Sequence, residues 1–303
     1  MTASRTSIFH RMHHDAWATQ SQQCASEAPS VPNSLVKAPS PALNPSLARP
    51  TFAMKPRLGL PTDIEAVTNV IIKTMPLDPQ WDYRFPYRHR YPEDHHRYTR
   101  MLFEYFLDPE YDDWVVMVIE DSPKPEAPSE VVAFGVWDVS YMNKRRYGPG
   151  YKTQDRKSRC SRPSRADHPC KTRKDANHEH FNEFWKGQIK AYKKFFGSIG
   201  PEQIHLQILA TLPDFQRRGH GSSLCKWAME LVMRDSLNDM SVMASPMGNE
   251  LYTWLGFEDV GAFHIQVAGE SQRLVLHAMM YRPTKLRMAT SRKDADGSCC
   301  VVI

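Results

Sequence analysis

Residues 207 to 221 read Q-I-L-A-T-L-P-D-F-Q-R-R-G-H-G, and S-S-L-C-K-W-A-M-E-L follows at once. An apolar run rich in β-forming residues enters a Pro-Asp turn, and a glycine-containing basic loop then begins an amphipathic helix. Gly219 and Gly221 leave no side chain where the backbone must approach a ligand, and the amides of residues 217 to 222 lack acceptors because a helix begins there. Since a helix N-terminus carries partial positive charge, the loop predicts a pyrophosphate site, to which Arg217 and Arg218 add charge.

Composition narrows the classes of protein that fit. The 303 residues are 41% hydrophobic, which is enough for a core, and no run approaches the roughly eighteen apolar residues of a membrane span. The formal net charge is +5, but much of the Lys and Arg excess lies between residues 144 and 174, so no nucleic-acid role is predicted. The six cysteines are scattered and match no zinc finger, so we predict no metal site and expect a reducing, cytoplasmic environment.

The chain divides into one predicted domain and two tails. Residues 1 to 53 are rich in Ser, Ala and Pro and are expected to be a disordered tail, residues 54 to 283 a folded domain, and residues 284 to 303 a second tail. Within the domain, residues 143 to 180 are strongly basic and are interpreted as a mobile insertion. The alternative is an electrostatic patch for phosphates or an acidic partner.

Hydrophobic periodicity predicts alternating helices and strands. The segment 114 to 120 is almost wholly apolar and is expected to be a central strand, paired antiparallel with the next apolar run. The aromatic segment between Trp81 and Tyr91 fits either a substrate-facing lid or a packed loop. The predicted helices span 64–74, 95–106, 181–196, 221–234 and 248–255, and the predicted strands lie at 56–60, 114–120, 131–141, 204–211, 241–245, 263–267 and 273–281.

Two blocks of this sequence resemble the GNAT superfamily of acyl-coenzyme A-dependent N-acetyltransferases. The loop at residues 216 to 221 fits the family's [QR]-x-x-G-x-[GA] motif, and A-S-P-M-G-N-E-L-Y-T-W-L-G-F at 244 to 257 is similar to its strand and [LF]-Y-x-x-x-G-F helix ending. Y-P-E-D at 91 to 94 and F-L-D-P-E-Y-D-D-W at 106 to 114 resemble fungal-type GNAT-domain proteins. The resemblance implies an α/β GNAT fold, with a mixed, mostly antiparallel central sheet, two splayed middle strands and helices on both faces.

The resemblance also implies a reaction, the transfer of an acetyl group from acetyl-coenzyme A to a primary amine by direct attack. The alternative is a GNAT fold that binds acyl-coenzyme A, or a protein partner, without catalysis. Backbone groups of the strand are expected to pair with the pantetheine arm, and an amide near Ala210 to bind the carbonyl oxygen as it gains charge. The cofactor-binding residues implied are Leu209, Ala210, Thr211, Gln216, Arg217, Arg218, Gly219, His220, Gly221, Ser222 and Asn249.

Tyr252 matches the family's general acid, which protonates the departing thiolate. The base is less defined: histone-type members carry a glutamate where this chain has His205, and a histidine can take the ammonium proton directly or through water. Strand alternation predicts that His205 shares a face with Gln207 and Leu209. Asp138 is the second candidate base, and a water relay without a single base is the third alternative.

The last four residues, from Cys300 to Ile303, have the form C-a-a-X, with Cys299 beside them and basic residues upstream. Prenylation of Cys300 and palmitoylation of Cys299 would supply the two signals that stable membrane attachment needs. The alternative is a frayed tail that matches by chance. The sequence identifies neither the amine acceptor nor a monomeric or dimeric state.

Overall fold

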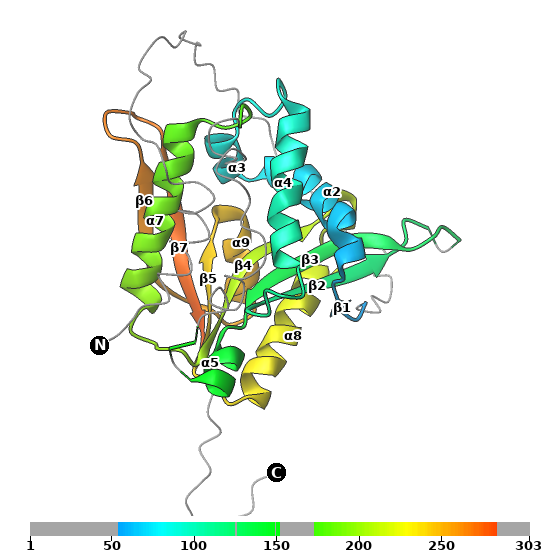
Figure 1. Ribbon diagram of the computed structural model, residues 1–303, viewed down its shortest axis with the longest axis vertical. Coiled ribbons are helices and arrows are strands. Elements are labelled where there is room, and N and C mark those ends of the chain that lie inside the picture. Colours follow the sequence, from blue (N-terminus) through cyan, green and yellow to red (C-terminus); the bar gives the residue numbers. More distant parts are fainter. Residues whose placement is uncertain (1–53, 125, 149, 152–172, 284–303) are drawn as a thin grey trace, which may run out of the picture.

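The computed structural model describes residues 54–283 except 125, 149 and 152–172. Its centre is a seven-stranded sheet with the order β1-β2-β3-β4-β5-β7-β6 (Figure 1). Neighbouring strands of this sheet are antiparallel except for β4 and β5, which are parallel. The strands are β1 (Arg57–Leu58), β2 (Trp114–Asp121), β3 (Glu130–Asp138), β4 (Gln203–Thr211), β5 (Asp239–Ala244), β6 (Glu258–Gln266) and β7 (Arg273–Tyr281).

Helices cover both faces of the sheet (Figure 1). Strand β3 shows the two layers, because Trp137 packs toward α8 while its neighbour Val136 packs toward α2 and α4. Helix α7 lies along β6. The helices are η1 (Pro61–Asp63), α2 (Ile64–Thr74), η2 (Met75–Leu77), α3 (Pro79–Arg84), α4 (Pro92–Phe106), α5 (Tyr141–Tyr147), α7 (His178–Phe196), η4 (Pro213–Phe215), α8 (His220–Arg234) and α9 (Pro246–Trp254). The predicted mixed, mostly antiparallel sheet between helical layers is confirmed.

A β-bulge in β4 changes which side chains face which layer. Val136 pairs with Ile208 and Trp137 with Leu206, so Gln207 has no partner on β3. One extra residue reverses the alternation of the strand: Leu206 packs on the α8 side of the sheet, and Ile208 packs on the α2 side.

The predicted common face of His205 and Leu209 is therefore wrong. The His205 ring lies against Tyr192 and Phe196 of α7, whereas Leu209, beyond the bulge, packs against the core under α8. The change of face occurs at Gln207, the bulged residue between them.

The parallel pair β4 and β5 separates within the sheet. Pairing runs from Gln203 opposite Asp239 to Leu206 opposite Val242, and β4 then continues to Thr211 without a partner on that side. An unpaired strand edge leaves backbone donors and acceptors unsatisfied unless a ligand or water meets them. The predicted splaying of the middle strands is confirmed.

The predicted basic insertion is too wide at both ends. Residues 141 to 147 form α5, in which Asn143 is buried, and Arg173 and Asp175 are buried before α7 begins. The α7 N-terminus is capped by Asn177, whose Oδ1 accepts from the amides of Glu179 and His180. Residues 152–172, both tails and Cys299 and Cys300 lie outside the described residues.

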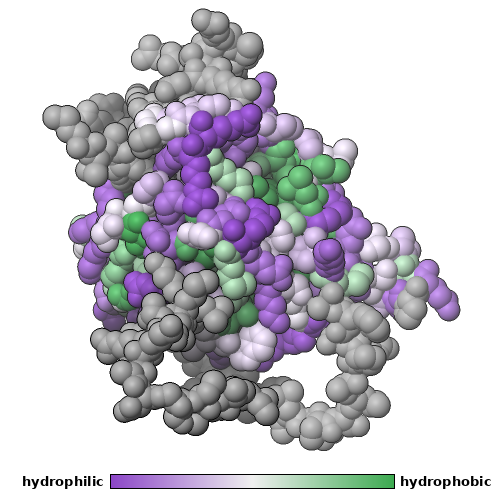
Figure 2. Space-filling model, turned by 90° about the horizontal axis from the view of Figure 1, so that it is seen from below, coloured by the Kyte–Doolittle hydropathy of each residue, from purple (hydrophilic) through white to green (hydrophobic). Residues whose placement is uncertain are grey.

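The molecular surface seen in Figure 2 is mostly hydrophilic, and its apolar residues lie in separate patches. In the part of the chain that the structure describes, no helix combines the length and the apolar character needed to cross a bilayer.

Candidate active site

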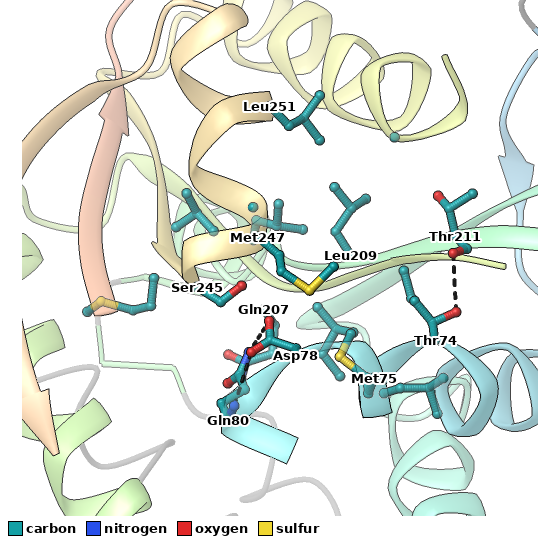
Figure 3. Close-up of a pocket in the computed structure, with 18 of the residues that line it drawn as sticks. Thr74, Met75, Asp78, Gln80, Gln207, Leu209, Thr211, Ser245, Met247 and Leu251 are labelled. Atoms are coloured by element: carbon teal, nitrogen blue, oxygen red, sulfur yellow. Dashed lines mark hydrogen bonds between the residues drawn. The ribbon is translucent and has the colours of Figure 1, made fainter. Parts of the chain in front are cut away.

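A pocket of about 780 Å³ opens where β4 and β5 separate. Its walls include the second half of β4, the segment from η2 to α3, the loop into α8, and α9 (Figure 3), and residues of α2, α4, α7 and β5 add to the lining. The loop and the β4 edge, which the sequence singled out, thus meet in one cavity with Tyr252 of α9.

The loop before α8 presents backbone donors to this pocket. Arg217 and Gly219 adopt the left-handed conformation, with φ of 63° and 89°. Within the described residues, the amides of residues 217 to 222 donate to no backbone acceptor, and Ser223 donates the first bond, to Gly219 O. A left-handed backbone turn at a helix N-terminus forms an anion-binding concavity. The loop residues that line the pocket are Gln216, Arg217, Gly219, His220, Gly221 and Ser222.

Two predicted cofactor-binding side chains point elsewhere. His220 Nε2 lies 3.0 Å from Asp121 Oδ2, and Arg218 lies 3.6 Å from the same carboxylate and donates to Asp214 O. Burial lowers the pKa of His220. These side chains fix the loop to the end of β2, so the loop's contribution to the pocket is its backbone together with Arg217.

The open edge of β4 supplies a second row of backbone groups. Leu212 N donates to Val132 O, so by the two-residue alternation of an antiparallel ladder Ala210 also faces β3. Leu209 and Thr211 therefore direct their amides and carbonyls toward the gap. Thr211 O accepts from Thr74 Oγ1 at 3.2 Å and from Gln216 Nε2 at 3.1 Å. The amide that faces the pocket belongs to Leu209 or Thr211 and not to Ala210.

Tyr252 enters the pocket from α9. Its ring lies over Gly248, where an added Cβ would come within 2.8 Å of the ring, so a side chain there would displace it. Burial raises the pKa of Tyr252 well above 10, and nearby Cys225 and Asp78 act in the same direction. The hydroxyl forms no hydrogen bond within the described residues, so it is a protonated donor without a protein acceptor there.

The two candidate bases have different positions. His205 lines the pocket, and its Nδ1 lies 2.9 Å from Ser241 Oγ. Ser241 donates to Gln203 Oε1 at 3.2 Å, so His205 Nδ1 carries the hydrogen and Nε2 is the basic nitrogen. Asp138 does not line the pocket, and its Oδ1 accepts from Ser140 N in the turn after β3.

Asn249 is also outside the set of pocket-lining residues. Its Oδ1 accepts from Thr253 Oγ1 at 3.4 Å on the same helix, so its side chain stabilises α9 locally. The residues that the structure brings together are thus the loop, the edge of β4, Tyr252 and His205.

Sequence reasoning missed two buried charged residues in the pocket. Asp78 caps α3, accepting from Gln80 N at 3.1 Å and Gln80 Nε2 at 3.2 Å, and Arg84 ends the same helix. Both line the pocket, together with Gln207, whose Oε1 is buried without a partner among the described residues. Figure 3 shows Asp78 and Gln207 next to each other. Asp78-Pro79 is a recognisable helix start, the one sequence signal for this element.

The aromatic segment is mainly packed structure. Trp81 lines the pocket, but Tyr83 and Phe85 are buried away from it and Tyr87 is exposed. Of the two predicted roles, the packed loop therefore describes most of these residues.

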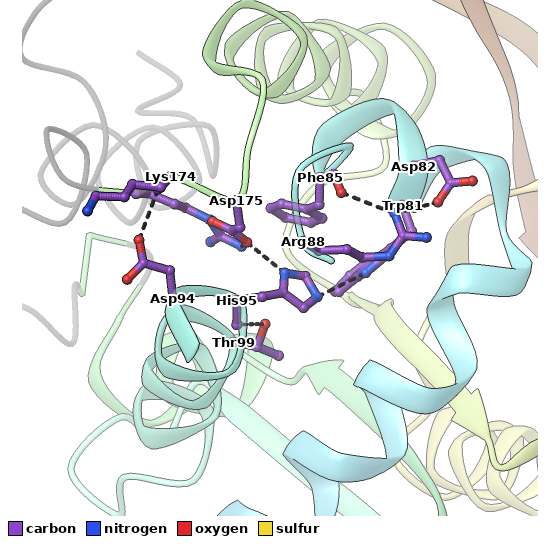
Figure 4. A network of polar contacts seen from close by, with 10 residues as sticks. Trp81, Asp82, Phe85, Arg88, Asp94, His95, Thr99, Lys174 and Asp175 are labelled. Atoms are coloured by element: carbon purple, nitrogen blue, oxygen red, sulfur yellow. Dashed lines mark hydrogen bonds and ion pairs between the residues drawn. The ribbon is translucent and has the colours of Figure 1, made fainter. Parts of the chain in front are cut away.

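A buried ion cluster holds this segment in place (Figure 4). Trp81 Nε1 donates to His95 Nε2 at 3.2 Å, so His95 is neutral with its hydrogen on Nδ1, which donates to Asp175 Oδ2 at 2.6 Å. Arg173 donates to both oxygens of Asp175, at 2.6 and 2.7 Å. Burial acts to raise the pKa of Asp175, but the hydrogen bonds from His95 and Arg173 outweigh it and lower that pKa.

Acidification is expected to destabilise the protein through its buried histidines. Burial lowers the pKa of His95 and of His220 below 6.5, so the unfolded chain binds protons that the folded chain does not. Their contribution to stability is complete above the unfolded pKa and is lost as pH falls through it toward the folded pKa, by at most about 1.4 kcal/mol per pH unit for each group.

Urea unfolding between about pH 8 and about pH 5 measures this loss. His95→Gln should flatten the dependence of the free energy of unfolding on pH. His96→Gln changes the exposed neighbour on α4 and should leave it as in the wild type. Equal pH dependences for both variants would contradict the assignment to His95.

The pocket combines helix-terminal amides that have no backbone acceptor among the described residues with the open edge of a separated strand pair. Such a site can bind an extended anionic ligand. No family model matches the chain. Over 70 residues it is 34% identical to a curated protein of Stachybotrys chartarum named acetyltransferase; the match covers 23% of this chain and 30% of that relative. The matched part is thus less than a third of the relative's length.

Solved structures of acetyltransferases are similar at low sequence identity. One is described as histone acetyltransferase HPA2 and related acetyltransferase from Corynebacterium glutamicum, with 16% identity, coverage of 77% of this chain and 97% of that chain, and a TM-score of 0.44. Another is NAA60 of Arabidopsis thaliana in complex with acetyl-CoA, with 14% identity, coverage of 76% and 98%, and a TM-score of 0.43.

Proposed function

We propose that this protein is a GNAT-type N-acetyltransferase that transfers an acetyl group from acetyl-coenzyme A to a primary amine. The observation that carries the proposal is the convergence, in one pocket, of three features: the amides of Arg217 and residues 219 to 222, which have no backbone acceptor among the described residues, the open edge of β4, and the protonated hydroxyl of Tyr252. The GNAT-like sequence blocks and the name of the Stachybotrys chartarum relative support it.

The residues present fit such a cofactor. The loop amides and Arg217 would hold the pyrophosphate, and the backbone groups of Leu209 and the amide of Thr211 would pair with the pantetheine arm, as the alternation of β4 allows. Acetyl-coenzyme A supplies the acetyl group as an activated thioester.

The chain's own groups would handle the protons and the developing charge. The buried hydroxyl of Tyr252 donates its proton to the departing sulfur, because its raised pKa keeps it protonated near neutral pH. An amide of Leu209 or Thr211 would donate to the carbonyl oxygen as it gains charge. His205 Nε2, or water next to it, would take the proton that the amine loses.

Calorimetry with acetyl-coenzyme A, followed by a thiol-release assay with an amine library, tests the proposal. Binding together with amine-dependent thiol release supports it. Binding without turnover for any amine would favour the non-catalytic alternative, in which the fold acts through a partner. Absence of binding would overturn both.

Gly219→Ala is expected to weaken acetyl-coenzyme A binding about tenfold. An L-residue in the left-handed region costs about 1–2 kcal/mol, which turns the amides that begin α8 away from the ligand. The matched control is Gly269→Ala, because Gly269 has φ of 87° and, like Gly219, open space around its missing Cβ, but does not line the pocket. Calorimetry on both variants makes the comparison, and equal affinities would contradict the role of the loop.

A further inference from the structure

The pocket contains a buried carboxylate and a buried guanidinium, and neither forms an ion pair within the part of the chain that the structure describes. Asp78 is 7% exposed and Arg84 is 8% exposed, and both line the cavity. Among the described residues, the Asp78 carboxylate accepts hydrogen bonds from Gln80 alone, and the side-chain bond of Arg84 runs from its Nε to Gln80 O at 3.1 Å. The charge of Asp78 acts on Arg84 and partly offsets its burial, but burial without a direct ion-pair contact is still costly, so a ligand that pairs with both would be favoured.

Arg84 is held as an anion-binding group. Its guanidinium carbon lies 4.1 Å from the ring centroid of Phe184 and 5.1 Å from those of Trp81 and Phe85. The rings fix the guanidinium, while its two terminal nitrogens form no hydrogen bond among the described residues. Burial lowers the pKa of Arg84 to about 9, so it is still charged at neutral pH. A charged, planar guanidinium whose two terminal nitrogens can both donate matches the two oxygens of a carboxylate.

Asp78, unlike Arg84, favours a positively charged ligand group. Its neighbour in the pocket is Gln207, whose Oε1 is buried without a partner, so two acceptor groups point into the same cavity (Figure 3). Acceptors without donors suit an ammonium group, which has three N–H donors and no acceptor. Asp78 also lies close enough to Tyr252 for its charge to act on that hydroxyl, which puts the amine end near the proton donor.

The two charges are a short distance apart along one helix. Asp78 is the N-cap of α3 and Arg84 is its last residue, and six residues correspond to about 9 Å of helical rise. The Arg84 side chain turns back along the helix, because its Nε bonds to Gln80 O. The gap between the carboxylate and the guanidinium is therefore that of a small molecule.

We propose that the acceptor is a small zwitterion, an amino acid or a close analogue, whose ammonium binds Asp78 and Gln207 and whose carboxylate binds Arg84. This assignment rests on the proposed acetyl transfer, since it takes the Asp78 end of the pocket as the place where the amine is presented.

Wild-type kinetics test the assignment without any substitution. Free amino acids of increasing length are compared with their carboxamides, which keep the amine and lose the negative charge. We expect the best amino acid to have a KM roughly 10- to 100-fold below that of its amide, because a charge-assisted bond is lost in the amide. Equal KM values for acid and amide would overturn the zwitterion assignment and leave acetyl transfer standing. Failure to bind acetyl-coenzyme A would instead overturn the proposed function.

Substitution of Arg84 gives a second measurement. Arg84→Gln should abolish the preference for the acid over the amide, and Arg84→Lys should retain part of it, while both keep the affinity for acetyl-coenzyme A. Arg90→Gln is the control, since Arg90 is exposed and does not line the pocket. Calorimetric titration of the amino acid into protein saturated with coenzyme A gives a readout independent of turnover. An Arg84→Gln protein that binds acetyl-coenzyme A and still prefers the acid would refute the role of Arg84; if it does not bind acetyl-coenzyme A, the wild-type comparison decides.

Discussion

Tyr252→Phe is expected to lower kcat by about 100-fold or more, with little change in the affinity for acetyl-coenzyme A. General acid catalysis contributes about 10² to 10⁴ to a rate, and phenylalanine removes the proton donor while keeping the ring over Gly248. Because the hydroxyl forms no hydrogen bond in the described part of the chain, its removal should leave folding stability nearly unchanged. Steady-state thiol release and calorimetry measure the two quantities.

Tyr83→Phe is the matched control for this experiment. Tyr83 is also fully buried and burial raises its pKa as well, but it does not line the pocket. Its substitution should leave kcat as in the wild type. If Tyr252→Phe retained full kcat, a water molecule and not Tyr252 would have to protonate the sulfur.

Asp175→Ala is expected to lower the free energy of unfolding by about 3–5 kcal/mol. The carboxylate is wholly buried, receives both bonds from Arg173 and the bond from His95, and joins the segment before α7 to α4. Removing it leaves a buried guanidinium without its bidentate carboxylate, which is the costly way to break a buried pair. Urea unfolding at neutral pH measures the loss.

Asp82→Ala provides the comparison. Asp82 pairs with Arg88 at 2.6 Å, but its side chain is 58% exposed, so solvent screens the pair. We expect its substitution to cost less than about 1 kcal/mol. Equal losses for the two variants would mean that Asp175 does not have the role assigned here.

The elements of the fold were predictable because their signals are local. The helix at residues 64 to 74 was predicted with the bounds that α2 has, and the strand at 273 to 281 with those of β7. The α4 helix begins three residues before its predicted start, at Pro92, because proline is accepted in a first helical turn. Periodicity, caps and turn residues suffice for such elements.

The structure differs from the sequence-based predictions where the conformation of one segment depends on its contacts with another. The bulge at Gln207 is defined by pairing with β3, so the sequence of β4 alone could not show that His205 and Leu209 face opposite layers. The bond between His95 and Asp175 joins residues that are 80 positions apart, and no local pattern pairs them. Asp78 was recognisable as a residue type at a helix start, but its place with Gln207 in one pocket depends on the tertiary contacts of α3 with α7 and β7.

The position of β7 has a consequence for the order in which the molecule can be assembled during synthesis. β7 lies between β5 and β6 and pairs with both, although both precede it in the chain. Its Leu274 and Leu276 also complete the cluster that holds Tyr83 of α3 and Phe184 of α7. Strands β1 to β5 can pair as they leave the ribosome, but β6 has no partner until residues 273 to 281 follow, so the edge of the sheet that carries α7 closes last.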